Sequence, residues 1–326
     1  MIKTLKLYQG ENFDPYWNLA VEQHLLETVE PGCCILYLWQ NQNTVVIGRN
    51  QNAWKECRTS LLEAEGGRLA RRLSGGGAVF HDLGNLNFTF LVQAADYDLE
   101  RQLSVILHAC RSLGIQAERS GRNDVLAEGK KFSGNAFYKN GRNAYHHGTL
   151  LVDVDMARLG RYLNPSKAKL DAKGVQSVRS RVINLCELVP KLTISLLGER
   201  LSAAFKEVYR LPLQQITTDD LDGQAIQAFY QRNQSWEWNY GYRLPLNFTC
   251  EGQFGWGGIQ LELQVESGVV KQVKAYSDSM DWEMIPKLEK AITGCRFTLE
   301  DLKKRVMGCQ PDIGRDICEM LAQQDI

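Results

Sequence analysis

The chain of 326 residues carries 38 basic and 38 acidic side chains, and hydrophobic residues make up 44% of it. This balance is ordinary for a globular protein and excludes a chain-wide field that would attract nucleic acid or an anionic membrane. No apolar run reaches the length of a membrane span. From the charge balance and the lack of such a run, we expect neither nucleic acid nor a membrane as a partner.

The amino-terminal third begins with a helix and continues with strands. In NFDPYWNLAVEQHLLETV, residues 12–29, Asp14 can cap a helix and Pro15 fits its first turn. The β-rich segments CCILYLWQ and TVVIGRN flank the turn-like NQN and predict buried strands.

The segment LARRLSGGGAVFHD, residues 69–82, combines arginines with three consecutive glycines. A hairpin or bulge would explain any one glycine pair. Glycine in an ordered element lowers stability by roughly 0.5–1 kcal/mol relative to alanine, so ordering three consecutive glycines is unfavourable. Together with Arg71, Arg72 and His81, they favour a loop whose backbone lies close to a ligand.

The middle of the chain alternates strands and helices. NLNFTFLVQ predicts a strand, and DLERQLSVILHACRSLG predicts a helix that ends at Gly114. Asn140-Gly141 predicts a hairpin that pairs residues 132–138 with residues 144–154. Helices are expected in DMARLGRYL and TISLLGERLSAAFKEVYR.

These elements lack a strict βαβ rhythm, so we predict an α+β fold with a mixed sheet rather than a doubly wound parallel sheet. Composition changes near residues 239–247. A hairpin and short amphipathic helices follow, which predicts a large domain at 1–243 and a small α+β accessory domain at 248–326.

Several common sites are absent from the sequence. There is no P-loop, no GxGxxG and no GxSxG elbow, so the usual nucleotide folds and serine hydrolases are disfavoured. The five histidines show no metal-ligand spacing, and nine cysteines without a CxxC pair indicate free thiols in a reducing cytoplasm. The start of the chain, MIKTLKLYQG, does not read as a secretory signal.

Local cations gather near polar and small residues elsewhere. Asn123-Asp124 precede Lys130-Lys131, and LDAKGVQSVRSRVINL brings several basic residues together. Each of these could be a solvated loop. As a set they suit the activation of a carboxylic acid by ATP, in which cations must offset the repulsion between two anions.

The segments LARRLSGGGAVFHDLGN, SGRND, GKKFSG, HHGTLL and KGVQSVRSRV closely resemble those of lipoate–protein ligases of the bacterial two-domain type. The resemblance extends to DPYWNLAVE, LWQNQNTVVIGRNQNAWKEC, YLNPSKAKL and SWEWNYG, and it covers nearly the whole chain. No single motif is decisive, but the ordered set is highly specific. It implies a biotin/lipoate ligase-like fold.

The resemblance also implies roles for individual residues. Lys131 is expected to be the catalytic lysine that holds the carbonyl and phosphate oxygens of lipoyl-AMP, whereas Lys130 should point away. The implied lipoate-binding residues are Leu19, Val21, Glu22, Trp39, Arg72, Ser74, Gly75, Gly76, Gly77 and His81. The implied nucleotide-binding residues are Ala78, Val79, Phe80, Asn123, Asp124, Lys131, Ser133, His147, Gly148, Thr149, Lys173 and Arg181.

By the same resemblance, ATP and Mg²⁺ are co-substrates, Asp124 is a magnesium contact, and no prosthetic group is tightly bound. Lipoate becomes lipoyl-AMP, octanoate would give octanoyl-AMP, and the acyl group is then transferred to a lysine of an acceptor. The acceptors implied are the lipoyl domains of 2-oxoacid dehydrogenase complexes and the glycine-cleavage carrier protein. Residues 173–182 would form a mobile loop over the adenylate, and the accessory domain would reorient between the steps.

Three alternatives remain. An octanoyl or lipoyl transferase would need no ATP and would use a cysteine, for which Cys186 is the candidate, although its apolar setting would raise a thiol pKa. A biotin ligase is disfavoured by the glycine pattern and by the carboxy-terminal domain. A binder without catalytic activity is weakly disfavoured by Lys131 and Asp124.

Overall fold

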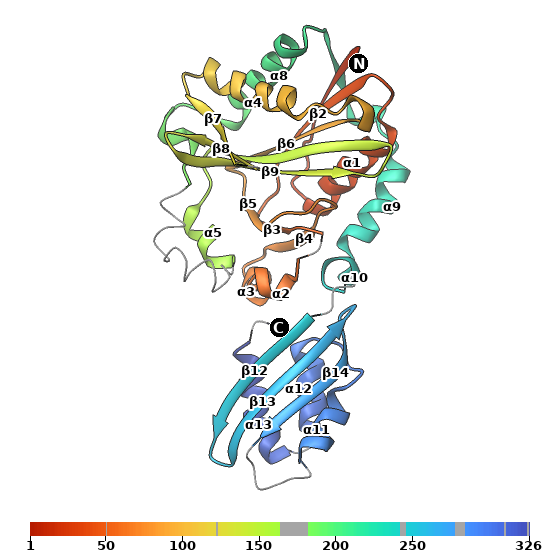
Figure 1. Ribbon diagram of the computed structural model, residues 1–326, viewed down its shortest axis with the longest axis vertical. Helices are drawn as coiled ribbons and strands as arrows, with labels where there is room; N and C mark the ends of the chain where they lie inside the picture. Colours follow the sequence, from red (N-terminus) through yellow and green to blue (C-terminus); the bar gives the residue numbers. More distant parts are fainter. Residues whose placement is uncertain are drawn as a thin grey trace.

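The computed structural model describes residues 1–49, 51–121, 123–163, 182–241, 246–277, 284–309, 311–324 and 326. Two groups of elements lie one above the other (Figure 1), the larger at the amino-terminal end of the chain. None of the helices in the described ranges combines the length and apolar character that a bilayer-spanning segment needs.

An eight-stranded mixed sheet is the centre of the larger group. Its order is β11 (Leu213–Ile216), β1 (Thr4–Gln9), β2 (Cys33–Trp39), β6 (Asn85–Gln93), β10 (Asn143–Leu151), β9 (Lys130–Lys139), β8 (Asp124–Ala127) and β7 (Ala117–Ser120). β1 runs parallel to both of its neighbours, and the other pairs are antiparallel. The predicted α+β class with a mixed sheet is therefore confirmed.

The two faces of this sheet have different covers. Helices α4 (Leu99–Ser112) and α8 (Ile194–Tyr209) pack on one face (Figure 1), where Phe88 and Phe90 meet Phe205 in the main core. The other face carries α1 (Pro15–Thr28) and a smaller sheet. The candidate site lies on this second face.

The smaller sheet has three strands, in the order β4 (Arg68–Arg71), β3 (Thr44–Ile47) and β5 (Val79–His81). The two strands predicted on either side of NQN are both present and buried, but they belong to different sheets. The short NQN connection therefore carries the chain from the large sheet to the small one.

Local sequence features set the bounds of several elements. The Asp14 side chain accepts a hydrogen bond from the Tyr16 N–H at 2.8 Å, and Pro15 occupies the first turn of α1 as predicted. The predicted hairpin at Asn140-Gly141 is confirmed, because β9 and β10 pair antiparallel on either side of it.

Shorter helices complete the larger group: α2 (Ala53–Glu56), α3 (Thr59–Ala64), α5 (Met156–Tyr162), α9 (Gly223–Gln234) and α10 (Trp236–Asn239). Among the described residues, single 3₁₀ turns lie at Ala94–Asp96, Leu185–Glu187 and Thr218–Asp220. α9 packs along α1 at one side of the group (Figure 1).

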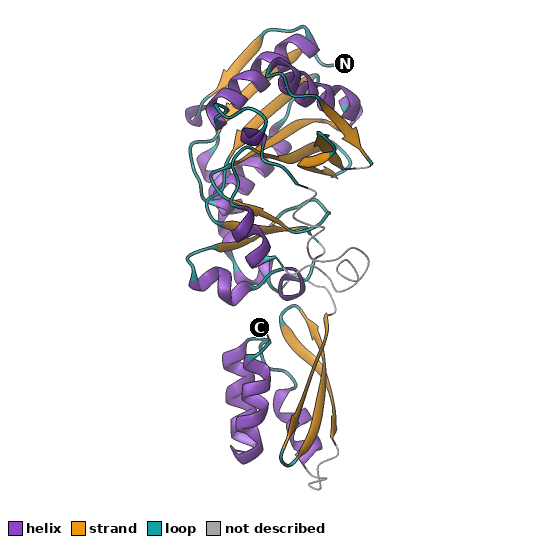
Figure 2. Ribbon diagram, turned by 90° about the vertical axis from the view of Figure 1, so that its left-hand side faces the viewer, coloured by secondary structure: helices purple, strands orange, loops and turns teal. Residues whose placement is uncertain are grey.

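The carboxy-terminal group is an antiparallel sheet of β12 (Leu246–Phe254), β13 (Gly257–Glu266) and β14 (Val269–Ser277). Helices α11 (Met284–Ile292), α12 (Leu299–Cys309) and α13 (Pro311–Ala322) cover one face of it (Figure 2). The predicted hairpin and helices are confirmed. β12 was not predicted from the sequence, where its polar residues and glycine obscure the strand pattern.

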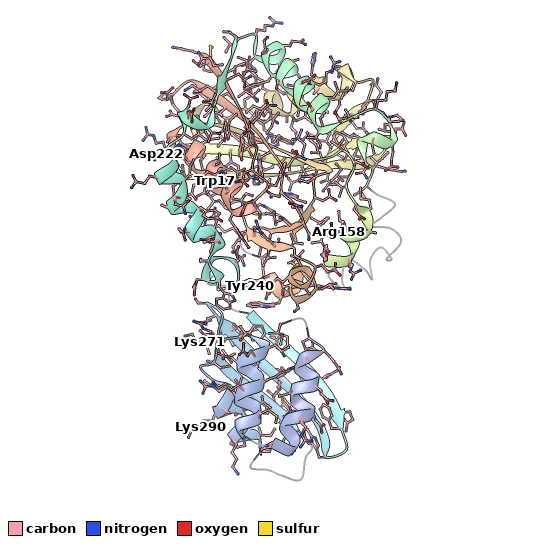
Figure 3. The ribbon with its side chains drawn as sticks, turned by 180° about the vertical axis from the view of Figure 1, so that it is seen from behind. Trp17, Arg158, Asp222, Tyr240, Lys271 and Lys290 are labelled. Carbon is pink, nitrogen blue, oxygen red and sulfur yellow. The ribbon has the colours of Figure 1, made fainter. Side chains whose placement is uncertain are left out.

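The two groups meet through aromatic side chains. The Trp54 ring of α2 meets Phe297 edge-on at a centroid distance of 5.0 Å and lies 5.6 Å from Tyr240. Tyr240 lies at the junction of the two groups (Figure 3). A Cβ atom on Gly268 would lie 2.0 Å from the Trp236 ring, so backbone and ring are in close contact there.

Candidate functional site

The floor of the candidate site is the face of the large sheet that is turned away from α4 and α8. Strand register places Thr149 of β10 opposite Asn87 of β6, and Asn87 opposite Trp39 of β2. Because side chains on one face recur every second residue, the next row on this face consists of His147, Thr89 and Tyr37. Polar and aromatic groups from three strands are thus brought side by side.

A glycine loop, residues 74–77, forms one wall of the site between β4 and β5. The buried Arg72 guanidinium holds this loop, since its Nη2 donates to the Gly75 carbonyl at 2.7 Å and the Gly77 carbonyl at 2.8 Å. Burial lowers the pKa of Arg72 to about 10, so the group stays charged at neutral pH. Gly76 has a φ of +95°, which disfavours any other residue there.

Gly48, directly after β3, lies against the same loop. A Cβ atom at Gly48 would lie only 2.3 Å from the Gly76 carbonyl oxygen. The next residue reinforces the contact, because the Arg49 N–H donates to the Ser74 carbonyl at 2.8 Å. The sequence analysis quoted Gly48 within a motif but gave it no role, and only the fold reveals this contact.

Between this loop and the sheet is a cavity of about 470 Å³. Most of the residues predicted for the site line it: Leu19, Trp39, Arg72, Gly76, Gly77, Ala78, Val79, Phe80, His81, Asn123, Asp124, Lys131, His147, Gly148 and Thr149. A wider, open depression of about 1070 Å³ lies elsewhere on this group and is lined by none of the predicted residues. The smaller cavity is therefore the candidate site, and its volume suits a small molecule.

Some described residues of the predicted set do not line this cavity: Val21, Glu22, Ser74, Gly75 and Ser133. Val21 is buried in the packing of α1 against the sheet. Ser133 is buried too, and its Oγ accepts a hydrogen bond from Asn135 Nδ2 at 3.3 Å. Glu22 and Ser74 reach the cavity only through His147, as follows.

A continuous hydrogen-bond chain runs beneath the cavity. Trp39 Nε1 donates to Thr89 Oγ1 at 3.1 Å, and Thr89 Oγ1 donates to Glu22 Oε1 at 2.7 Å. His147 Nδ1 lies 2.8 Å from the same oxygen, and its Nε2 lies 2.8 Å from Ser74 Oγ. With Nδ1 turned to the carboxylate, Nε2 is the ring nitrogen that pairs with the serine hydroxyl. The chain fixes the orientation of Trp39 and His147.

An ion pair lies among the residues that line the cavity. Lys131 Nζ is 2.7 Å from Asp124 Oδ1, and these side chains are 37% and 42% exposed. The ammonium group lies over Gly134, where a Cβ atom would be 3.1 Å from Nζ and 3.9 Å from Thr149 Oγ1. Lys130, the preceding residue, is exposed and does not line the cavity.

Lys173 and Arg181, with nearly all of the predicted loop at 173–182, fall in residues 164–181 and lie outside the described residues. The described chain resumes at Val182, which lines the cavity. The Ile183 N–H donates to the Lys131 carbonyl at 3.0 Å.

Metal-binding capacity at the site is limited to Asp124. In the part of the chain that the structure describes, no group of three or more His, Cys, Asp or Glu side chains could hold a metal ion. Asp124 is the single carboxylate among the described residues that line the cavity. This donor set fits a magnesium ion held chiefly by phosphate oxygens and water.

Cys186 does not line the cavity. Its Sγ donates to Asp153 Oδ1 at 3.4 Å, and partial burial together with this carboxylate raises the thiol pKa. Among the described residues that line the cavity there is no cysteine. The structure thus places no thiol of the described chain where an acyl carrier would be needed.

The sequence analysis missed several lining residues: Val46, Asn87, Gly134, Asn135, Ala136, Leu151, Leu159 and Leu163. For Asn87 the sequence contained a usable pattern. Asn85, Asn87 and Thr89 alternate with apolar residues in NLNFTFLVQ, which indicates a polar face on a strand that is otherwise buried.

Comparison with known proteins agrees with this geometry. A family model for the lipoyl protein ligase A/B catalytic domain matches residues 14–206. A second, for the bacterial lipoate protein ligase C-terminus, matches residues 245–321.

Solved structures extend the likeness. LipL1 of P. falciparum in complex with lipoate is 27% identical with a TM-score of 0.65, over 98% of this chain and 99% of that one. A structural analysis of an archaeal lipoylation system, which covers a bipartite lipoate protein ligase and its E2 lipoyl domain from Thermoplasma acidophilum, gives a second match. It is 27% identical with a TM-score of 0.65, over 74% of this chain and 97% of that one.

A lipoate-protein ligase A bound with ATP is 25% identical with a TM-score of 0.63, over 74% of this chain and 99% of that one. The catalytic-domain match covers more than half of the chain. The chain therefore belongs to the lipoyl protein ligase A/B family, with a catalytic domain joined to a bacterial lipoate protein ligase C-terminus.

Proposed function

We propose that this protein is an ATP-dependent lipoate–protein ligase. In the first step a carboxylate oxygen of lipoate attacks the α-phosphorus of ATP, and the bond from that phosphorus to the bridging oxygen breaks. Lipoyl-AMP forms and pyrophosphate leaves. The Lys131 ammonium group, which lies over Gly134, would offset the negative charge that these two anions bring together.

In the second step the ε-amine of an acceptor lysine attacks the lipoyl carbonyl carbon. A carbon–nitrogen bond forms, the carbon–oxygen bond to phosphate breaks, and AMP leaves with the electron pair while the amine loses a proton to solvent. The acceptors proposed are lipoyl domains of 2-oxoacid dehydrogenase complexes and the glycine-cleavage carrier protein. We keep the cytoplasm as the expected compartment for this reaction.

One observation carries this proposal: apolar side chains and an ammonium group line the same cavity. Leu19 and Trp39 supply apolar walls suited to a narrow acyl chain, and Lys131 supplies the charge. Solved relatives carry lipoate in one case and ATP in another, which supports both substrates.

The other predicted residues take roles around these three. We assign Arg72 and the glycine loop to the acyl group, and Asn123, Asp124, Gly148 and Thr149 to the adenylate. Magnesium would enter with ATP and meet Asp124, and it would supply charge neutralisation to the phosphates. Lys173, Arg181 and the reorientation of the accessory domain remain predictions of the family resemblance.

The transferase alternative requires Cys186 as acyl carrier. The bond of its thiol to Asp153 and its raised pKa make it a poor nucleophile. Cys186→Ser should therefore leave lipoylation at the parental rate, whereas a cysteine-dependent transferase would lose it.

Lipoate-dependent exchange of labelled pyrophosphate into ATP tests the proposal directly. We expect exchange with lipoate and none with biotin, and octanoate measures chain specificity. Lys131→Ala should lower exchange by roughly 100-fold or more, since a charge-stabilising donor is lost. Lys130→Ala is the matched control and should keep the parental rate. Exchange with biotin alone, or full exchange in Lys131→Ala, would refute the proposal.

A further inference from the structure

One buried polar atom in the wall of the cavity has no hydrogen-bond partner within the described chain. It is Nε2 of His81, whose residue is only 3% exposed and lines the cavity. A buried donor or acceptor without a partner is unfavourable unless a ligand satisfies it. Whether this atom donates or accepts depends on which ring nitrogen carries the proton.

Backbone contacts decide that question, starting at Asn18. Asn18 Nδ2 donates to two main-chain carbonyl oxygens, those of Asn12 and Gln40, both at 2.8 Å. Carbonyl oxygens only accept, so the orientation of the Asn18 amide is unambiguous. The same Nδ2 lies 3.0 Å from the side chain of Asn41, which must therefore present its oxygen, Oδ1.

With Oδ1 of Asn41 turned to Asn18, its Nδ2 faces His81 Nδ1 at 3.1 Å. An amide nitrogen donates, so His81 Nδ1 must accept and carries no proton. The proton of the neutral ring then sits on Nε2, the buried ring nitrogen that has no partner within the described chain. Asn18 and Asn41 are both fully buried, so water cannot reverse this order.

The neutral state of His81 has its own cause. Burial, together with the nearby Arg72 guanidinium and His147, lowers the pKa of His81 to about 3. The ring therefore stays uncharged throughout the physiological range and offers one N–H to the cavity.

The acyl substrate has one strong acceptor group, its carboxyl, because the alkyl chain has none and ring sulfur accepts only weakly. A second unpartnered buried atom, Nδ2 of Asn87, belongs to the floor of the same cavity, and Asn87 lies opposite Thr149 in the strand register. Thr149 Oγ1 accepts from the N–H of Gly134 at 3.2 Å, and the Lys131 ammonium group lies over this glycine. His81 meets Trp39 edge-on, and Trp39 is the other register neighbour of Asn87.

We propose that His81 is a neutral hydrogen-bond donor to the carboxyl oxygen of the acyl substrate, and that Asn41 and Asn18 are positioning residues that keep its proton on Nε2. The identity of the substrate rests on the proposed function. When the acceptor amine attacks, negative charge grows on the acyl carbonyl oxygen, and a fixed N–H donor there stabilises it without reorganisation.

Nitrogen NMR of the ligand-free protein tests the tautomer without any substrate. The protein is labelled with ¹⁵N-histidine, and the His81 signals are assigned by their loss in His81→Gln. We expect a protonated Nε2 and an unprotonated Nδ1. A proton on Nδ1, or on both nitrogens at neutral pH, would overturn the proposal whatever reaction the protein catalyses.

Asn41→Asp tests the positioning role, since a carboxylate can only accept and would draw the proton to Nδ1. We expect the NMR pattern to change and lipoate affinity, measured by calorimetry without ATP, to fall roughly 10- to 100-fold. Gln42→Glu adds the same charge at the exposed neighbouring position and should change neither. Parental spectra and affinity in Asn41→Asp would contradict the proposal.

If the buried charge prevents Asn41→Asp from folding, Asn41→Leu removes the donor with little change in volume. Both tautomers of His81 should then appear, and a pure Nε2–H form would exclude Asn41 as the positioning residue. A failure of the proposed function is distinguishable, because pyrophosphate exchange would be absent in the parent protein while the parental tautomer remains measurable.

Discussion

At the residue scale, the site combines buried cationic and neutral nitrogen groups whose partners are fixed. Arg72 donates to carbonyl oxygens of the glycine loop and of Val46 in β3 rather than to a carboxylate, so it shapes the glycine loop and leaves a positive potential beside it. His147 lies in the large sheet and His81 in β5 of the smaller one, and they have different environments, one bonded to Glu22 and the other to Asn41. Each ring therefore has a defined role in hydrogen bonding.

The contact of Gly48 with the glycine loop leads to the first prediction at this scale. Gly48→Ala would add a Cβ atom that, without a shift of the backbone, would lie only 2.3 Å from the Gly76 carbonyl oxygen. We expect the loop to shift and kcat/KM for lipoate to fall roughly 10- to 100-fold. Gly223→Ala, at an open position at the start of α9, should not change kinetics. Parental kinetics for Gly48→Ala would mean that the loop geometry does not matter.

Two buried histidines predict a dependence of stability on pH. Burial lowers the pKa of His81 and of His146 to about 3, against 6.5 for an ordinary histidine. Below about pH 6.5 the unfolded chain binds protons that the folded chain does not, so stability falls as pH falls toward about pH 3. From about pH 6 to about pH 5 the free energy of unfolding should drop by roughly 2 kcal/mol from these two residues.

Chemical denaturation across this pH range measures the effect. His146→Phe is the matched variant, because His146 is already packed among Phe88, Phe90 and Phe137 and the ring can be replaced there. About half of the pH dependence should disappear in that variant. An unchanged slope would show that His146 is protonated in the folded protein.

At the element scale, α1 carries two of the functional side chains and is held by its first turn. Asp14 caps the helix, and its Oδ2 also lies 2.8 Å from Arg68 Nη1. Leu19 lines the cavity and Glu22 lies beneath it, so the position of α1 sets both the slot and the hydrogen-bond chain.

Substitutions at Asp14 separate these two interactions. Asp14→Ala should lower the free energy of unfolding by about 1 kcal/mol, because a helix cap is lost. Asp14→Asn retains a capping oxygen and loses only the exposed ion pair with Arg68, so it should be clearly milder. Chemical denaturation of both variants measures the difference, and equal losses would assign the effect to the ion pair instead.

At the scale of the whole molecule, two compact groups share a small aromatic junction. Trp54 packs with the core of the carboxy-terminal group, although it belongs to α2 of the larger group. We propose that residues 1–243 and 248–326 fold as separate domains and that this junction couples them. Such a limited contact is compatible with a change of domain orientation during catalysis.

Trp54→Ala tests the coupling. Removing the ring should weaken the coupling by roughly 1–3 kcal/mol and separate the calorimetric unfolding transitions of the two groups. Trp17→Ala is the control, since Trp17 packs on Tyr230 far from the junction (Figure 3) and should lower stability without separating the transitions. Identical profiles for the two variants would show that Trp54 does not couple the groups.

Many of these elements could be predicted from the sequence, because their formation depends on residues that are neighbours along the chain. The Asp14 cap, the Asn140-Gly141 hairpin and the helices of the carboxy-terminal group follow from local propensity and periodicity. The ordered motifs also indicated the family, and most of the residues that they implied line one cavity.

Only the tertiary structure decided which distant groups meet. Strand register aligns Trp39, Asn87 and Thr149, and nothing local in the sequence reveals that row. The approach of Gly48 to Gly76 and the bond from Asn41 to His81 likewise join different elements of the fold. Periodicity along a chain fixes which face a side chain takes, whereas its partners depend on how sheets pair and pack, which is a non-local property.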